Sequence, residues 1–185
     1  MKSKVIMDSE TITRALSRIA HEILERNKGA KELRIIGIRR RGIHLARRLV
    51  DKIQELAGIK PPLGTLDITL YRDDFRRRTD WPSVQKTEIP FSVEDKNVIL
   101  VDDVLYTGRT TRAAIEAIMD YGRPASIQLA VLVDRGGHRE LPIQADYMGI
   151  KVMTIRTQKV DVLLKELDGR DEAIVLQLDS PNEAG

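Results

Sequence analysis

The chain has 185 residues, enough for one domain that buries most of the surface its unfolded form exposes. It carries 31 Lys and Arg against 28 Asp and Glu, and this formal charge of +3 allows a polyanionic partner without requiring one. The absence of cysteine excludes disulfides, thiol nucleophiles and zinc–cysteine sites. Since no apolar run approaches the roughly 20 residues of a membrane span and no signal-peptide pattern is present, we expect a cytoplasmic protein.

Helix and strand patterns alternate along the chain, without internal repeats or flexible linkers. Asp8 and Ser9 are suitable N-cap residues for the first helix, and Gly29 can end it. In chain order, the hydrophobic pattern predicts a helix over 9–27, a strand over 33–38, a helix over 43–56, strands over 66–71 and 98–101, a helix over 112–121 and a strand over 127–133. Strands that read as aliphatic runs, separated by helices, indicate an α/β fold with a mostly parallel sheet covered on both faces.

Two segments depart from this alternation. Residues 72–88 are polar and lack an apolar period, which is typical of a lid or a binding loop. Near the C-terminus, Asp168-Gly169 separates the strand-like runs 160–167 and 172–178 and predicts a β-hairpin. We expect residues 1–185 to form a single domain.

The stretch from Val98 to Thr111 carries the clearest chemical signal. A buried strand ends in Asp102 and Asp103, and a loop with one glycine, Gly108, and several hydroxyl groups leads into a helix. Ligands of open α/β sheets bind beyond the carboxyl ends of the strands, and the unpaired N–H groups of a helix start suit a phosphate. The two carboxylates would repel that phosphate, so ribose hydroxyls or a divalent cation suit them better. Alone, the same residues also fit a turn and a helix cap, and the chain has neither a Walker A loop nor a dinucleotide-binding fingerprint.

This stretch closely resembles the phosphoribosyl-diphosphate-binding signature of the type I phosphoribosyltransferases: four aliphatic residues, two acids, two aliphatic residues, any residue, then Thr-Gly-x-Thr. Most of the chain also resembles the branch of that family that regulates pyrimidine operons and acts as a uracil phosphoribosyltransferase. The matching segments are ALSRIAHE at 15–22, GIRRRG at 37–42, DITLYRDD at 67–74, SIQLAVLVDRG at 126–136 and HRELPI at 138–143. The resemblance implies the type I phosphoribosyltransferase fold, with a mobile flap at about 72–88 and a small hood at about 134–160.

Members of this family transfer ribose 5-phosphate from phosphoribosyl diphosphate to a base nitrogen and release diphosphate. The resemblance implies that Asp102 and Asp103 are catalytic, because they hold the ribose hydroxyls and help to neutralise a cationic sugar. The substrate-binding residues that it implies are Arg40, Arg41, Arg72, Lys86, Val104, Leu105, Tyr106, Thr107, Gly108, Arg109, Thr110, Asp134, Arg135 and Val160. It also implies Mg²⁺ as cofactor, held mainly through substrate and water without a dedicated side-chain ligand.

Two features of these residues bear on the substrate. Arg39 to Arg41 form a charge run that alone is typical of a solvated surface, but beside the phosphate signature they match the family's pyrophosphate loop. The family usually has threonine at position 40, so Arg40 adds a charge. Tyr106 stands where purine-specific members commonly have an aspartate, which favours uracil over a purine. An aromatic residue that packs at a loop tip without a ligand is the alternative for Tyr106.

The first helix indicates a second activity. Arg14, Arg18 and His21 share one face of it by their spacing, which alone is typical of a solvated helix face. In the regulator branch this helix and the His138-Arg139 segment form part of a basic surface on a dimer that binds leader mRNA of pyrimidine operons. The RNA-binding residues implied are Arg14, Ser17, Arg18, His21, His138 and Arg139.

Three residues depart from the regulator pattern: Gly137 is an insertion, Gln144 replaces an arginine, and Ile150 stands in place of a lysine. Several functions therefore remain open. The chain is expected to be a uracil phosphoribosyltransferase that forms UMP and regulates by UMP- or UTP-dependent RNA attenuation. The alternatives are a phosphoribosyltransferase without RNA regulation, a purine-type enzyme, and a regulator with weak catalysis. A homodimer or higher homo-oligomer is expected by resemblance.

Overall fold

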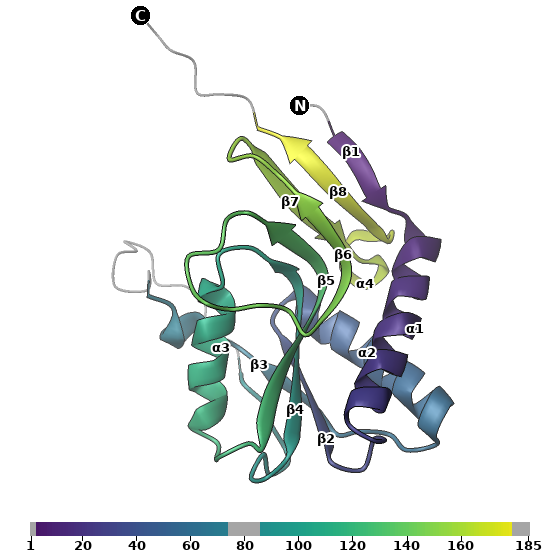
Figure 1. The fold of residues 1–185 in the computed structure, drawn as a ribbon, viewed down its shortest axis with the longest axis vertical. Coiled ribbons are helices and arrows are strands. Elements are labelled where there is room, and N and C mark those ends of the chain that lie inside the picture. Colours follow the sequence, from purple (N-terminus) through teal and green to yellow (C-terminus); the bar gives the residue numbers. More distant parts are fainter. Residues whose placement is uncertain (1–2, 74–85, 179–185) are drawn as a thin grey trace, which may run out of the picture.

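The computed structural model describes residues 3–73 and 86–178 (Figure 1). In chain order its elements are β1 (Ser3–Met7), α1 (Ser9–Arg26), β2 (Leu33–Ile38), α2 (Arg41–Ala57), β3 (Leu63–Leu66), the 3₁₀ helix η1 (Thr69–Tyr71), β4 (Asn97–Leu105), α3 (Arg109–Met119), β5 (Ser126–Gly136), β6 (Tyr147–Met153), β7 (Gln158–Leu163), α4 (Lys165–Asp168) and β8 (Glu172–Gln177). Within these residues no helix combines the length and the apolar character needed to cross a membrane.

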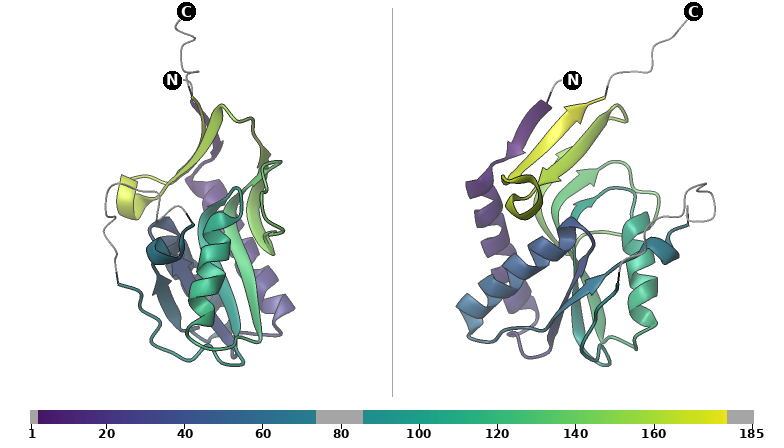
Figure 2. Two further views of the ribbon diagram at one scale, coloured as in Figure 1. Left: turned by 90° about the vertical axis from the view of Figure 1, so that its left-hand side faces the viewer. Right: turned by 180° about the vertical axis from the view of Figure 1, so that it is seen from behind.

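Five strands form a wholly parallel sheet in the order β3-β2-β4-β5-β6, which confirms the predicted α/β class. Helices α1 and α2 cover one face and α3 covers the other (Figures 1 and 2). Alternate residues of β4 enter two separate cores: Ile99 and Val101 pack with α1 and α2, whereas Val98 and Leu100 pack with α3. Because both faces of the sheet are buried, its central strands contain long aliphatic runs, and the sequence pattern predicts these runs well.

A second, antiparallel sheet with the order β1-β8-β7 lies at one end of the molecule (Figure 1). The antiparallel pairing of β7 with β8 confirms the predicted pairing of the two C-terminal segments. The connection between them differs from the expected tight turn, because α4 intervenes and ends at Gly169 in a left-handed conformation. The segment 134–160, expected as a hood, contains the end of β5, all of β6 and the first residues of β7. Only its last residues belong to the small sheet.

The strand expected at 66–71 is wrong in its bounds. Strand β3 ends at Leu66, because the carboxylate of Asp67 accepts hydrogen bonds from both the N–H and the hydroxyl of Thr69. This local turn leads the chain into η1.

Strand β4 is longer than predicted. It continues through the two acids to Leu105, since Asp102 and Val104 still pair with β5. Helices α2 and α3 also begin a few residues earlier than their apolar periods indicate, at Arg41 and Arg109. Strand β6 is not predicted by the pattern, because it is an edge strand whose side chains are mostly only partly buried.

Candidate active site

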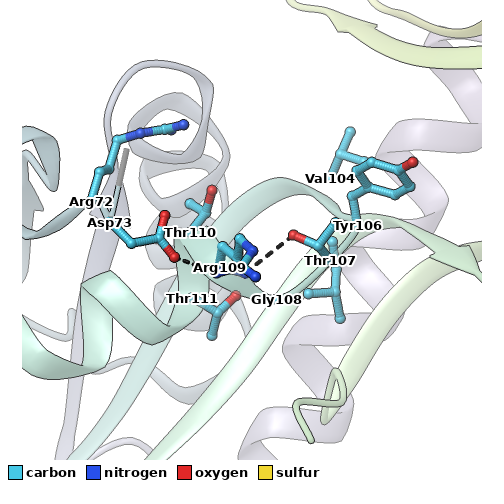
Figure 3. A pocket seen from close by; sticks show the side chains of 10 residues that line it. Arg72, Asp73, Val104, Tyr106, Thr107, Gly108, Arg109, Thr110 and Thr111 are labelled. Carbon is cyan, nitrogen blue, oxygen red and sulfur yellow. Dashed lines mark hydrogen bonds and ion pairs between the residues drawn. The ribbon is translucent and has the colours of Figure 1, made fainter. Parts of the chain in front are cut away.

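A pocket of about 600 Å³ opens at the carboxyl end of β4, beside the first turn of α3 (Figure 3). The consecutive residues from Val104 to Thr111 line it, together with Arg72 and Asp73. The structure thereby brings together these predicted substrate-binding residues: Arg72, Val104, Leu105, Tyr106, Thr107, Gly108, Arg109 and Thr110. The end of a central parallel strand is where open α/β sheets bind ligands.

The loop before α3 has the geometry of an anion site. Gly108 adopts φ +94°, in the left-handed region that favours glycine, and a Cβ there would lie 3.3 Å from the side chain of Ile143. As N-cap residue it has no side chain to occupy the first N–H groups of α3, so these can bind a phosphate. The carbonyl of Thr107 accepts a hydrogen bond from the Glu140 N–H at 3.0 Å, which fixes the loop against the segment after β5.

Arg109 spans one side of the pocket. Its guanidinium forms an ion pair with Asp73 (Figure 3). It forms a second ion pair with Glu140 at 2.5 Å. These pairs are about half exposed, so an incoming phosphate can compete with the two carboxylates for the arginine. This bridge could not be predicted from a local motif, because its three residues come from separate segments of the chain.

The acid pair lies directly before this loop. Asp102 is 8% exposed, and its Oδ1 accepts a hydrogen bond from the N–H of Asp103 at 2.9 Å. Burial, and then the negative charge of Asp103, raises the pKa of the Asp102 carboxyl well above its usual value. Asp103 is only half-buried and accepts the Val104 N–H at 3.0 Å. Most of the negative charge of the pair therefore belongs on Asp103.

We expect an Asp102→Asn variant to become more stable relative to the wild type as the pH rises from about 5 to 8. The Tm of the variant minus the Tm of the wild type should therefore increase over this range. A carboxyl whose pKa is raised on folding holds more protons folded than unfolded, so the wild type loses stability as pH rises above the usual carboxyl pKa. Asparagine does not titrate and avoids this loss. For this chain length, each kcal/mol corresponds to roughly 2–4 °C in Tm. Thermal unfolding across this pH range measures it, and a difference that is constant with pH would contradict the assignment.

The first turn of α2, directly after the arginines Arg39 and Arg40 (the arginine loop), packs against β4 at Asp102. A Cβ at Gly42 would lie 2.4 Å from the Val101 carbonyl oxygen and 3.2 Å from the Asp102 Cα, so the first turn of α2 contacts β4 directly. Arg40 is exposed, whereas the guanidinium of Arg41 pairs with Asp168 at 3.2 Å. The loop backbone therefore lies beside the catalytic candidates, while Arg41 faces α4.

Lys86 and Val160 are not brought to the pocket. The Lys86 ammonium pairs with Glu88 at 3.2 Å on an exposed surface, and the Val160 side chain is buried in the core beneath the small sheet. Arg39, which follows β2, contacts the Lys86 segment, since its guanidinium donates to the Lys86 carbonyl at 2.8 Å. Residues 74–85 of the expected flap lie outside the described residues.

Tyr106 forms the aromatic wall of the pocket (Figure 3). The guanidinium carbon of Arg135 lies 3.8 Å from the ring centroid, and the ring of His138 lies 5.2 Å away. Arg139 donates to the carbonyl of Tyr106 and, at 2.6 Å, to the buried carboxylate of Asp134. Asp134 and Arg135, which were predicted to bind substrate, therefore lie next to this wall together with His138 and Arg139.

The other predicted RNA-binding residues lie on α1. Arg14 and His21 are exposed, and Arg14 pairs with Glu10 at 2.6 Å, while Ser17 is half-buried. Arg18 is already engaged, because its guanidinium donates to the carbonyls of Met148 and Gly149 at 3.0 and 2.8 Å and pairs with Glu22. It anchors α1 to β6, a role that its position on the helix face did not indicate.

The chain matches the family model of the phosphoribosyl transferase domain over residues 3–166. It is 56% identical over 178 residues to "Bifunctional protein PyrR" of Caldicellulosiruptor bescii, covering 96% of this chain and 97% of the relative. The protein of the same name from Pelotomaculum thermopropionicum is 57% identical over 172 residues, with 93% and 94% covered. A solved hypoxanthine phosphoribosyltransferase of Trypanosoma cruzi matches with a TM-score of 0.70 over 95% of this chain and 97% of that one. At 17% identity, this likeness shows a shared fold and nothing about activity.

Proposed function

Because the chain belongs to the phosphoribosyltransferase family, in the branch of the bifunctional PyrR proteins, we propose that it converts uracil and phosphoribosyl diphosphate into UMP and diphosphate and regulates pyrimidine operons. One observation carries the enzymatic half. The stretch from Val104 to Thr111, which runs from the end of β4 into the first turn of α3, lines a pocket directly after the acid pair, and the helix start in it suits an anion. The expected homo-oligomer remains part of this proposal.

The residues divide the reaction between them. The N–H groups at the start of α3 and the hydroxyls of Thr107 and Thr110 bind the 5-phosphate and so fix the ribose. As the bond from the anomeric carbon to diphosphate breaks, the sugar becomes cationic, and the carboxylate of Asp103 stabilises that charge. In the arginine loop the exposed Arg40 provides a cation for the leaving diphosphate, and the base binds along Tyr106.

The acid pair fits the expected Mg²⁺ as a partner for its bound waters, not as a complete set of metal ligands. Within residues 3–73 and 86–178, no group of three or more His, Cys, Asp or Glu side chains could hold a metal ion. Two adjacent carboxylates suit an ion that arrives with the diphosphate and keeps several waters, as Mg²⁺ does. When bound, Mg²⁺ would neutralise charge on the diphosphate, and Asp102 and Asp103 would orient its waters.

We expect uracil to be converted, and hypoxanthine and guanine to react at no more than a few per cent of its rate. Tyr106 offers an aromatic face but no carboxylate to accept a hydrogen bond from a purine imidazole, and unpaired polar groups reject a substrate strongly. Each labelled base is offered separately with phosphoribosyl diphosphate and Mg²⁺, and the nucleotide formed is quantified. Efficient use of hypoxanthine would make this a purine-type enzyme.

For the regulatory half, we expect the protein to bind the leader hairpin of a pyrimidine operon, and UMP to strengthen that binding. Arg14→Ala should flatten the dependence of log K on log salt by about one unit if Arg14 neutralises one phosphate. Arg14 is a better probe than Arg18, because Arg18→Ala would also remove the bonds that hold α1 on β6. Uracil transfer should not change, since α1 contributes nothing to the described pocket lining.

The measurement is a gel-shift titration against the leader and a scrambled hairpin, with and without UMP. Feedback requires the product to favour the RNA-binding state, and linkage makes that coupling reciprocal. If the wild type binds the leader no better than the scrambled hairpin, the chain is a phosphoribosyltransferase without RNA regulation.

A further inference from the structure

The short helix α4 and the turn after it are attached to α2 through arginine side chains (Figure 1). Arg48 forms the firm attachment. Its guanidinium donates to both oxygens of Glu166, at 2.9 and 2.5 Å, and to both oxygens of Asp171, at 3.1 and 2.8 Å. Two bidentate pairs on one guanidinium hold the segment 165–171 against α2.

A second arginine, Arg41, lies about two turns earlier on the same face of α2 and is held much less firmly. Its Nη2 donates to the two carboxylate oxygens of Asp168 at 3.2 and 3.3 Å. Its Nε is buried and has no hydrogen-bond partner within the described part of the chain. A buried donor without an acceptor is unfavourable, so this position leaves the guanidinium incompletely satisfied and able to exchange Asp168 for a better acceptor.

Asp168, in contrast, is fixed in place. Its carboxylate accepts the N–H of Leu164 at 2.9 Å, and the segment that carries it is held by Arg48. This hydrogen bond from Leu164, and then the charge of Arg41, hold the pKa of the Asp168 carboxyl below its usual value. The pair therefore consists of an immobile anion and an arginine that can move.

The place of Arg41 in the chain connects this pair to the proposed diphosphate site. Arg41 is the first residue of α2. It lies between Arg40, the exposed cation proposed for diphosphate, and Gly42, which contacts β4 at Asp102. A long side chain at this point can turn either to Asp168 or to an anion beside the arginine loop. Diphosphate is the stronger partner, because it offers more charge and more acceptor oxygens than one carboxylate.

We infer that Asp168 is an internal competitor of diphosphate, which holds Arg41 on α4 and so weakens the binding of ligands that carry a diphosphate. The inference rests on the proposed function, because it requires diphosphate to bind at the arginine loop. A ligand whose binding-competent state is only partly populated loses affinity by that fraction. Asp168 thereby favours release of the diphosphate product, since it binds Arg41 again as the product leaves.

The test is the affinity for inorganic diphosphate with Mg²⁺, measured by calorimetry on the full chain for the wild type and Asp168→Asn. Asparagine keeps an acceptor oxygen for the Leu164 N–H and removes the charge that holds Arg41. Partly exposed ion pairs are weak, so we expect diphosphate to bind about two- to fivefold more tightly to the variant. UMP, which carries no diphosphate, should bind with unchanged affinity. A gain in affinity for one ligand alone is not what a damaged fold produces.

Asp171→Asn is the matched control. It removes the same charge from the same segment, but its partner is Arg48, so Tm should fall while diphosphate affinity stays within about 1.5-fold of the wild type. A double-mutant cycle identifies the cation. In an Arg41→Met background no guanidinium can be released, so adding Asp168→Asn should change diphosphate affinity less than about 1.5-fold.

If Asp168→Asn does not fold, nuclear magnetic resonance of the wild type gives the answer. The Nε–H signal of Arg41, identified by its loss in Arg41→Met, should shift when diphosphate and Mg²⁺ are added and not when UMP is added. An Arg41 signal that does not respond to bound diphosphate would show that Arg41 stays on Asp168.

Diphosphate binding that is unchanged or weaker in Asp168→Asn would overturn the inference. An equal gain in Asp171→Asn, or a gain that persists in the Arg41→Met background, would overturn it as well. A wild type that binds neither diphosphate nor phosphoribosyl diphosphate in the presence of Mg²⁺ would instead contradict the proposed function. The two failures are therefore distinguishable.

Discussion

Replacing Asp103 with asparagine is expected to lower kcat about 100-fold or more, with Tm close to that of the wild type. The change preserves size and the acceptor oxygen for the Val104 N–H, but it removes the charge that faces the cationic sugar. Asp103 is half-buried at the end of the central strand, next to the anion-binding loop, so its charge is poorly screened. Steady-state kinetics with uracil and phosphoribosyl diphosphate measure the effect.

Two matched variants give the comparison. Asp102→Asn should reduce kcat less than Asp103→Asn, because the raised pKa of Asp102 leaves less negative charge to remove. Asp51→Asn makes the same chemical change at an exposed position on α2, and its kcat should equal that of the wild type. An Asp103→Asn enzyme with near-normal kcat, or one no slower than Asp102→Asn, would refute the assignment of the charge to Asp103.

The fold was largely predictable because its central strands are buried on both faces. The run 33–38 matches β2 residue for residue, because burial on both faces of the sheet selects the leucine and isoleucines that make up most of it. The apolar pattern does not predict the bounds of an element where backbone pairing or partial exposure determines them. Asp102 ends the aliphatic run of β4 without ending the strand, because the backbone pairing with β5 continues. Strand β6 is at the sheet edge, where the apolar pattern weakens.

The candidate site likewise has one part that the sequence predicts and one part that it does not. Its phosphate loop is one contiguous stretch, so a local motif was enough to predict the pocket lining from Val104 to Thr110. The surroundings of Tyr106 depend on residues that the fold brings from about 30 positions away, such as Arg135 and Arg139. No local pattern reports such contacts. For this reason Arg139 was predicted on an RNA-binding surface, while the structure places its guanidinium against the pocket wall.

Gly42→Ala is expected to lower kcat/KM for phosphoribosyl diphosphate about 100-fold. The new Cβ would lie 2.4 Å from the Val101 carbonyl oxygen, closer than any real contact, so one of the two segments must move. Val101 pairs with both Gly37 and Ala130 in the middle of the sheet, so it is held on two sides. The arginine loop is the part that shifts, away from the acid pair, and a displacement of about 1 Å at a positioning element can cost 100-fold in rate.

Gly58→Ala is the matched control at the other end of α2. Gly58 has φ +69°, and a Cβ there would meet nothing within 4 Å, so the substitution costs about 1–2 kcal/mol of backbone strain and creates no clash. Its Tm should fall by several degrees while kcat/KM stays at the wild-type value. The comparison therefore separates lost stability from a displaced loop. A Gly42→Ala enzyme whose kcat/KM falls no further than that of Gly58→Ala would show that the contact between α2 and β4 does not position the diphosphate site.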